Sequence, residues 1–594
     1  MIRQKASFQF GPFRLDAAER QLLRDGTPVP LAPRVFDTLV ALVKNSGRLL
    51  PKDELIRTLW PDSFVEEGTL ARNISDLRRI LGESAGEVRY IETVPKAGYR
   101  FVAPVTQVSD DDSTLIIQRR TRSRIVLEEE VSANAPITSI AVLPFKPLAA
   151  SDGDDYLGLG VADALITRLT NIHRMRVRPT SSVFRYVGMR EVPEAAGRQL
   201  GVAAVLDGSI QRSSDRIRIT VQLVSVKDGS TLWAQKFDER FTDIFTVEDS
   251  ISEQVVEALT LKLSGEERKL LTKHQTENTE AYQAYLKGRY FWNKRSTEWL
   301  NKGANYFKQA IDLDPSYASA YTGLSDSYTL LVVREAIPPG EGFANAKASA
   351  RMALELDSKS AEAHASLGHA SLHNWEWDDA EKELQKAIEL NPSYPSAHHW
   401  YSEHLTAMGR FDESISELKL AARLDPLSLI ISADLGRAYY YARKYDDVMK
   451  QEARTLEMDS NFWLSHINLG RSYTQIGKHS EAIEELQKAR ELSKGSTEAI
   501  SFLGFAYAAA GDRTHAMEML RELDEQSKRS YVPPYHLAVL HTGVGKKDLA
   551  FESLECSYDN HAVDLFTLKV EPMFDSLRND SRYRDLLDRI GLGS

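Results

Sequence analysis

Cysteine is almost absent from this sequence, with Cys556 alone among 594 residues. One thiol cannot form an intramolecular disulfide or a multi-thiolate zinc site, which favours a reducing compartment. Long apolar runs are also missing. The first residues contain no signal core, and the longest weakly polar stretch, 502–510, is far shorter than the ~20 residues of a spanning helix. We therefore expect a cytoplasmic protein that is neither exported nor inserted in a membrane.

An excess of basic residues is missing as well. The formal net charge is -11, which argues against a protein that coats nucleic acid or an anionic membrane along its whole length. Residues 1–105 differ, because they contain 16 Lys and Arg but only 13 Asp and Glu, which gives a net charge of +3. The remaining residues then have a net charge of -14. Any DNA contact is therefore expected near the N-terminus.

The length predicts several modules, because single cores stop growing near 250 to 300 residues and ~150 residues per domain suggests about four. A composition of 42% hydrophobic and 27% charged residues is that of an ordinary globular protein. The predicted fold class is multidomain: an α+β winged helix-turn-helix, a small α/β domain and an all-α solenoid.

Residues 1–105 have the pattern of a winged helix. Short strands and turns are expected over 8–30, and helices are expected from Pro33, from Pro51 and from near Thr69. The third helix has one narrow apolar stripe, made by Leu70, Ile74, Leu77 and Leu81. The segments VRYIETV and YRFVAPV flank 95–98 and predict a hairpin after that helix.

Two regions of different character follow. Residues 106–136 carry their charges in blocks, DDD, RRTRSR and EEE, and are expected to be a linker. Residues 137–265 alternate between strand and helix patterns, beginning with the buried strand ITSIAVLPF. We interpret them as a small α/β domain.

Residues 279–565 contain a repeat of 34 residues, the tetratricopeptide period. Small residues recur at this spacing: Gly368, Ser402, Gly436, Gly470, Gly504 and Ala538. They are expected where the two helices of one repeat cross closely. About eight repeats are predicted, and residues 566–594, which break the pattern, are expected to cap the solenoid.

The third helix of residues 1–105 presents a polar face opposite its apolar stripe. At 100° per residue this face holds Arg72, Ser75, Asp76 and Arg79, which are suited to base edges in a major groove. The flanks hold Thr69, Asn73 and Arg78, which are suited to phosphate. The alternative interpretation is an ordinary solvated helix face.

Residues 8–104 resemble the OmpR/PhoB-type winged-helix family, and more closely its CadC-like branch, which has no preceding receiver domain. The resemblance depends on Phe10-Gly11, Leu31-Ala32-Pro33, Leu59-Trp60, Ile74-x-x-Leu77-Arg78 and the run from Tyr90 to Phe101. It implies base contacts from Arg72, Ser75 and Asp76, and backbone or wing contacts from Asn73, Arg78, Thr93, Lys96, Tyr99 and Arg100. Many family members are basic where this chain has Ser75-Asp76, so the operator is not implied.

The family also implies a contact loop for RNA polymerase between the second and third helices. Its candidate residues here are Asp62, Phe64, Glu66 and Glu67. Helix capping or simple solvation explains the three acidic residues equally well, so both interpretations stay open.

The middle region resembles the TolB N-terminal or FlgO-like module through Ile140-Ala141-Val142-Leu143-Pro144-Phe145, Asp155-Tyr156, Gly160-x-x-Asp163-x-Leu165 and Leu206-Asp207-Gly208-Ser209. No ligand is implied by this resemblance. The acidic turn 151–155 lacks the spaced ligands of a calcium loop and is interpreted as a plain turn.

The repeats resemble tetratricopeptide proteins, whose arrays bind peptide or protein in a concave groove. Register places His369, Glu403, Arg437 and Arg471 in that groove. Two neighbouring arginines could bind a carboxylate of a partner, or they could pair with acids of the repeats. The histidines of 398–404 are expected to pack, because no carboxylate or cysteine beside them completes a metal shell. No metal or cofactor is predicted.

The sequence thus predicts a DNA-binding transcription regulator whose output domain is of the two-component type but lacks an attached receiver. Its expected partners are double-stranded DNA, RNA polymerase and a protein or peptide in the repeat groove. The main alternative is a cytosolic scaffold whose winged helix no longer binds DNA. An enzyme is not expected, because no nucleophile, phosphate-loop or zinc-protease motif occurs in a fitting context.

Overall fold

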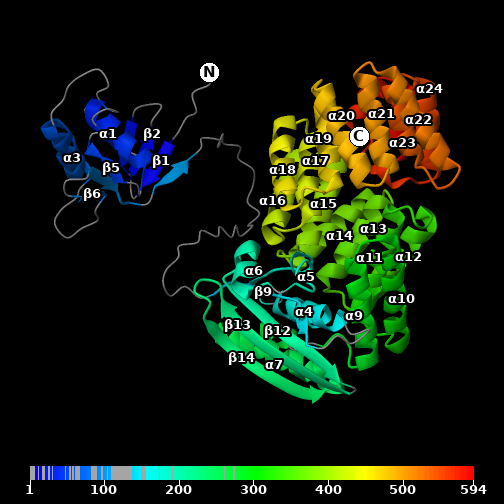
Figure 1. Cartoon of the computed structure of the whole chain (residues 1–594), viewed down its shortest axis with the longest axis horizontal. Coiled ribbons are helices and arrows are strands. Elements are labelled where there is room, and N and C mark those ends of the chain that lie inside the picture. Colours follow the sequence, from blue (N-terminus) through cyan, green and yellow to red (C-terminus); the bar gives the residue numbers. More distant parts are fainter. Residues whose placement is uncertain are drawn as a thin grey trace. The chain divides into compact units, whose positions relative to one another are not determined.

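The computed structural model forms two compact units, Met1–Glu130 and Val131–Ser594 (Figure 1). It describes residues 7–593 except 11–12, 17–20, 25–26, 30, 32, 47–48, 53–54, 56–58, 60–66, 82–89, 95–97, 104, 109–136, 149–154, 171, 173, 190, 214, 260, 262 and 272–273. Within this part of the chain, every helix is either too short or too polar to span a bilayer.

The first unit combines two antiparallel sheets with helices, as expected for a winged helix. The sheets have the orders β4-β3-β2-β1-β8 and β5-β7-β6. Its elements are β1 (Ser7–Phe10), β2 (Phe13–Asp16), β3 (Gln21–Arg24), β4 (Thr27–Val29), α1 (Pro33–Lys44), β5 (Leu49–Pro51), α3 (Glu67–Leu81), β6 (Ile91–Val94), β7 (Gly98–Phe101) and β8 (Thr106–Val108). The predicted hairpin is β6 with β7, whose register pairs Val94 with Gly98.

Three boundaries differ from the sequence interpretation. Pro51 ends strand β5 and pairs with Gly98, so the second helix starts after it, where the described residues Lys52, Leu55 and Leu59 are helical. The third helix begins at Glu67, two residues early. Residues 106–108 form β8, which pairs with β1 and so belongs to this domain instead of the linker. Pairing satisfies the backbone groups along an edge of β1 that would otherwise be open.

The second unit starts with a mixed sheet in the order β11-β9-β12-β13-β14, with β10 also paired to β12. Strands β9, β11 and β12 are parallel, and the long hairpins of β12, β13 and β14 are antiparallel. Its elements are β9 (Ser139–Val142), β10 (Lys146–Pro147), α4 (Asp155–Thr170), β11 (Arg176–Val177), α5 (Thr180–Phe184), α6 (Pro193–Leu200), β12 (Ala204–Ser213), β13 (Arg216–Ser225), β14 (Thr231–Arg240), η1 (Phe241–Asp243), α7 (Ile244–Ala258) and α8 (Gly265–Leu271). The middle region is therefore α/β, as predicted.

Sixteen helices follow in eight antiparallel pairs, coloured green to red (Figure 1). They are α9 (Thr279–Asn293), α10 (Thr297–Leu313), α11 (Ala318–Val333), α12 (Pro339–Leu356), α13 (Ala361–His373), α14 (Trp377–Leu390), α15 (Pro395–Ala407), α16 (Phe411–Leu424), α17 (Leu429–Tyr441), α18 (Tyr445–Met458), α19 (Trp463–Gln475), α20 (His479–Leu492), α21 (Thr497–Ala509), α22 (Arg513–Ser527), α23 (Pro534–Gly543) and α24 (Lys547–Asp559). The long helical region confirms the predicted solenoid.

The small residues of the 34-residue period lie where the two helices of a pair approach closely. A Cβ at Gly368 of α13 would lie 2.7 Å from Leu384 Cγ, and one at Gly470 of α19 would lie 2.4 Å from Leu486 Cγ. Larger side chains at these positions would overpack a core in which both leucines are fully buried.

The middle region and the repeats share a buried interface. Arg289 of α9 forms an ion pair with Asp163 of α4 at 3.0 Å. Farther along the solenoid, Arg178 donates to the carbonyl oxygen of Arg423 at 2.7 Å, and Ser181 donates to Asp425 at 2.6 Å. These contacts join the α/β region to both the first and the fourth helical pair.

The C-terminal residues do more than cap the last repeat. They form η2 (Val563–Thr567), η3 (Pro572–Leu577) and α25 (Ser581–Arg589). Helix α25 packs on α24, but η2 packs against α13 and α15 in the interior of the array, and η3 packs against α23. The segment 563–577 therefore returns along the helices that would line a concave groove.

Candidate nucleic-acid interface

Helix α3 has a buried face and a solvent face, as its periodicity predicts. Leu70, Ile74 and Leu77 are at most 1% exposed and join the core of the first unit. On the opposite side, the side chains of Thr69, Arg72 and Ser75 are exposed. An exposed arginine can form bidentate hydrogen bonds to guanine in a major groove.

Arg78 connects this helix to the hairpin. Its Nη2 donates to the carbonyl oxygen of Ile91 and to Thr93 Oγ1, both at 2.8 Å. In the same hairpin, Arg100 forms a 3.3 Å ion pair with Glu92. Arg78 and Thr93, both expected to contact phosphate, are thus hydrogen-bonded to each other, and this contact sets the position of α3 on the sheet.

Two other expected phosphate contacts point into the domain. Asn73 is 8% exposed and donates through Nδ2 to Thr38 Oγ1 of α1 at 3.2 Å. Tyr99 is 7% exposed and packs in the same core. Position 73 lies only 60° from Leu70 on a helical wheel, so the neighbouring helix covers it. We therefore assign Asn73 and Tyr99 to positioning the interface.

The remaining predicted residues of this interface are only partly described. Lys96 and the loop residues Asp62, Phe64 and Glu66 lie outside the described residues. Glu67, Asp76 and Arg79 lie in α3, but their side chains are not described.

Alanine at Asn73 should destabilise the first unit by about 1–3 kcal/mol, because Thr38 would lose a buried hydrogen-bond partner. DNA binding, measured on folded protein, should keep the salt dependence of the wild type, because no phosphate contact is lost. Urea unfolding and binding at several salt concentrations measure the two effects. A flatter salt dependence of DNA binding in Asn73→Ala would show that Asn73 does contact phosphate.

The four predicted groove residues lie on equivalent positions of α13, α15, α17 and α19, but the structure pairs them internally. Arg437 forms ion pairs with Asp434 at 3.0 Å and with Glu403 at 3.4 Å. Arg471 is 3% exposed and forms an ion pair with Glu571 of the C-terminal segment. Arg437 thus pairs with acids of the repeats, the second of the two sequence interpretations, whereas Arg471 pairs with an acid outside the repeats, which neither interpretation considered.

Segment 563–577 occupies the groove through polar and aromatic contacts. The hydroxyl of Tyr440 donates to Glu571 Oε1 at 2.7 Å, and Arg443 contacts Asp575 at 2.7 Å. The ring of Phe566 lies 5.2 Å from that of His373. A partner peptide would have to displace this segment or bind elsewhere.

A cavity of about 340 Å³ lies between the middle region and the repeats. Its wall includes the Arg289–Asp163 ion pair and Arg295, whose guanidinium lies 3.6 Å from the ring centre of Trp292. Burial lowers the pKa of Arg295 to about 10. The cavity is polar and aromatic, and it depends on both domains for its walls.

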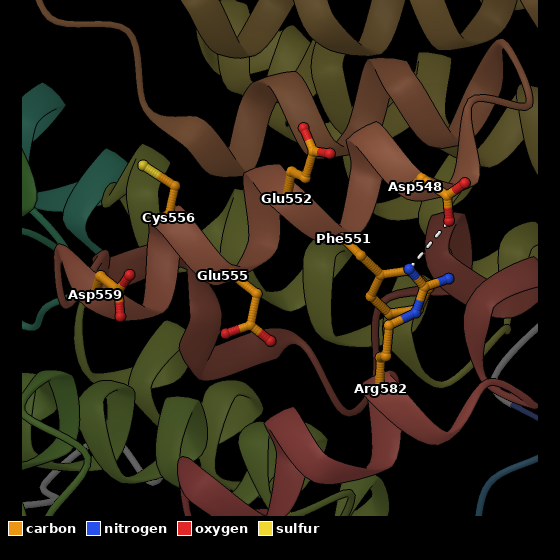
Figure 2. Close-up of a pocket in the computed structure, with 7 residues that line it drawn as sticks. All are labelled: Asp548, Phe551, Glu552, Glu555, Cys556, Asp559 and Arg582. Atoms are coloured by element: carbon orange, nitrogen blue, oxygen red, sulfur yellow. Dashed lines mark hydrogen bonds and ion pairs between the residues drawn. The ribbon is translucent and has the colours of Figure 1, made fainter.

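A second hollow lies on the outer surface of α24 (Figure 2). It is lined by Asp548, Phe551, Glu552, Glu555, Cys556, Asp559 and Arg582. Arg582 of α25 forms a 3.0 Å ion pair with Asp548 and lies over the ring of Phe551. These contacts fix α25 on the last repeat, and we assign no binding role to the hollow.

Comparison with known protein families matches the N-terminal region and two parts of the repeat region. Residues 26–101 match the family described as "Transcriptional regulatory protein, C terminal". Residues 376–428 and 465–495 match tetratricopeptide repeat families.

Among curated relatives, the transcriptional regulator HilA of Salmonella typhi is 23% identical over 460 residues, 76% of this chain and 77% of that protein. The transcriptional activator CadC of Escherichia coli is 33% identical over 115 residues, 19% of this chain and 22% of that protein. A putative adenylate cyclase 3 of Rhizobium meliloti is 28% identical over 248 residues, so the chain spans only 42% of the length of that relative.

Among solved structures, the DNA-binding domain of Escherichia coli CadC is 34% identical and covers 18% of this chain and 99% of that structure, with a TM-score of 0.17. Pseudomonas aeruginosa PilF is 19% identical and covers 36% of this chain and 94% of that structure, with a TM-score of 0.30. The chain therefore carries an OmpR/PhoB-type domain of the transcriptional regulatory family, similar to those of CadC and HilA, and tetratricopeptide repeats behind it.

Proposed function

We propose that this protein is a transcription regulator that binds duplex DNA through α3 and is controlled through its second unit. The observation that carries this proposal is the exposed face of α3 with Thr69, Arg72 and Ser75, held on a β-hairpin by Arg78 in a domain of the transcriptional regulatory family. Arg72 would read base edges, and the hairpin beside it would contact the backbone.

Control is proposed to act through the second unit, and not through phosphorylation of an aspartate in the chain. The loop before α3 is proposed to contact RNA polymerase, as in the family that it resembles. The repeats are proposed to bind a protein or peptide partner. Because segment 563–577 fills the groove, binding there would compete with an intramolecular ligand and would shift a two-state equilibrium. No catalytic role is proposed for either unit.

Selection of bound duplexes from a random pool, followed by sequencing, tests the proposal. On a selected site, Arg72→Ala should weaken binding about 5- to 150-fold, the effect of about 1–3 kcal/mol for one bidentate base contact. In competition with random duplex, the loss of affinity in Arg72→Ala should be confined to the selected sequence.

Lys44→Ala is the matched control, because it removes one exposed positive charge from the end of α1 in the same domain. If Arg72→Ala and Lys44→Ala weaken binding by the same factor, on selected DNA and on random DNA alike, α3 does not recognise base sequence. If no sequence is enriched at all, the scaffold interpretation replaces the regulator.

A further inference from the structure

Two histidines and a glutamate converge in the interior of the repeat array. His369 and His373 lie one turn apart on α13, and Glu403 lies on α15. Their Nε2, Nε2 and Oε2 atoms form a triangle, with 3.2 Å between the two nitrogens and 3.7 and 3.9 Å from these nitrogens to the oxygen. Two histidines at i and i+4 on one helical face are a spacing that binds zinc.

The size of this triangle matches a metal ion. A point equidistant from three atoms with these separations lies about 2.1 Å from each of them. Zinc binds imidazole nitrogen at about 2.0–2.1 Å and carboxylate oxygen at about 2.0–2.2 Å. The separations of the three ligand atoms therefore suit one ion between them.

One of the three ligand atoms lacks a hydrogen-bond partner, and the other two are hydrogen-bonded to each other. Glu403 Oε2 is buried and accepts no hydrogen bond from the described residues, although its other oxygen lies 3.4 Å from Arg437. A buried carboxylate oxygen without a donor is costly. The two histidine Nε2 atoms form a 3.2 Å hydrogen bond with each other. A cation between the three atoms would replace this bond and would also give the carboxylate oxygen a partner.

Both imidazole ligands are shielded from solvent. His369 is 5% exposed and His373 is 4% exposed. The ring of His369 stacks on Trp400 with centres 4.2 Å apart, which fixes its direction.

The other charged groups nearby are already paired. Arg437 contacts Asp434 at 3.0 Å in addition to Glu403, and His399 contacts Asp434 at 2.6 Å. This neighbouring set orients Glu403 from behind, in the manner of outer-shell partners at metal sites. On the open side, the ring of Phe566 covers His373.

We propose that this cluster binds one Zn²⁺ ion through His369 Nε2, His373 Nε2 and Glu403 Oε2, with a solvent molecule as the fourth ligand. Two imidazoles and one carboxylate favour zinc over calcium or magnesium, which take oxygen ligands. The ion would join α13 to α15 beneath η2, and so would stabilise the two repeats against which the C-terminal segment packs.

The test uses the full-length protein, stripped with a chelator and titrated with Zn²⁺ against a chromophoric competitor. The wild type should bind one Zn²⁺ per chain. Glu403→Gln, which preserves shape, and His373→Ala should each weaken binding at least about 100-fold, since loss of even an outer-shell partner costs 10- to 100-fold. Co²⁺ should give a tetrahedral absorption spectrum with the wild type that Glu403→Gln lacks.

His364→Ala is the matched control, because His364 lies on the same helix but contacts Glu383 at 2.5 Å outside the cluster. This variant should bind zinc as the wild type does. Circular dichroism identifies any variant that fails to fold. If His373→Ala does not fold, the zinc affinity and the Co²⁺ spectrum of Glu403→Gln decide whether the cluster binds metal. A wild type that binds no zinc, or a Glu403→Gln variant that binds it equally well, would overturn the proposal.

Discussion

Alanine at Glu571 should lower the free energy of unfolding of the second unit by about 3–5 kcal/mol, the usual cost of removing one partner from a buried ion pair. The Arg471 and Glu571 side chains are 3% and 1% exposed. Glu571 also accepts from the Tyr440 hydroxyl at 2.7 Å and from the backbone nitrogen of Met573 at 3.1 Å. Three donors would lose their acceptor at once.

Urea unfolding followed by circular dichroism measures this effect. Glu555→Ala is the control, because Glu555 pairs with Arg589 near the surface, with 42% of its side chain exposed, and such pairs contribute about 0–1 kcal/mol. Arg471→Met combined with Glu571→Gln should recover part of the loss, since no buried charge is left alone. Equal stability of Glu571→Ala and Glu555→Ala would mean that the segment does not occupy the groove in solution.

This pair also changes how experiments on the groove are interpreted. A charge-reversing substitution at Arg471 would place two buried carboxylates against each other. A loss of partner binding in such a variant would therefore reflect unfolding. Substitutions at Arg437, which is 32% exposed at its side chain, are less disruptive tests of partner binding.

The contribution of Glu452 to the stability of the second unit should be lost as pH rises from about 4.5 to about 8, and Glu452→Gln should remove this contribution. Glu452 of α18 is completely buried, and burial raises the pKa of its carboxyl to about 8. Its Oε1 accepts from Asn468 at 2.7 Å, while its Oε2 has no hydrogen-bond partner among the described residues.

The direction follows from proton binding. The folded state keeps its proton up to about pH 8, whereas the unfolded state releases it near 4.5, so stability is fully present below 4.5 and is lost as pH rises through 8. A pKa difference of this size between the folded and unfolded states corresponds to roughly 3–5 kcal/mol of stability. Between pH 5 and 8.5, the free energy of unfolding should therefore decline more in the wild type than in Glu452→Gln.

Urea unfolding at both pH values measures this difference, and contributions of other groups cancel in the comparison. Glu484→Gln is the control from the next repeat, because the Glu484 side chain is 67% exposed. If Glu452→Gln shows the same pH dependence as the wild type, Glu452 is ionised at neutral pH and has a partner in solution.

Local and periodic features of this protein could be predicted from its sequence. The apolar stripe of α3 and its exposed opposite face follow from helical periodicity, and the helical pairs follow from the 34-residue spacing. The register also placed His369 and Glu403 on equivalent positions of neighbouring repeats. The i, i+4 spacing of His369 and His373 was a further signal, but the prediction considered only the histidines of 398–404 and missed this cluster.

Contacts between distant residues could not be predicted in the same way. Asn73 was expected at the surface, but Thr38, 35 residues away on α1, decides that it is buried. Arg471 was expected to bind either a partner or an acid of the repeats, but Glu571, 100 residues away and outside the repeats, binds it. The sequence by itself determined the helices, their faces and their repeat register, because those depend on neighbours within a few turns. Only the tertiary structure decided which faces are covered, because the curvature of the stacked repeats brings the C-terminal segment into the groove.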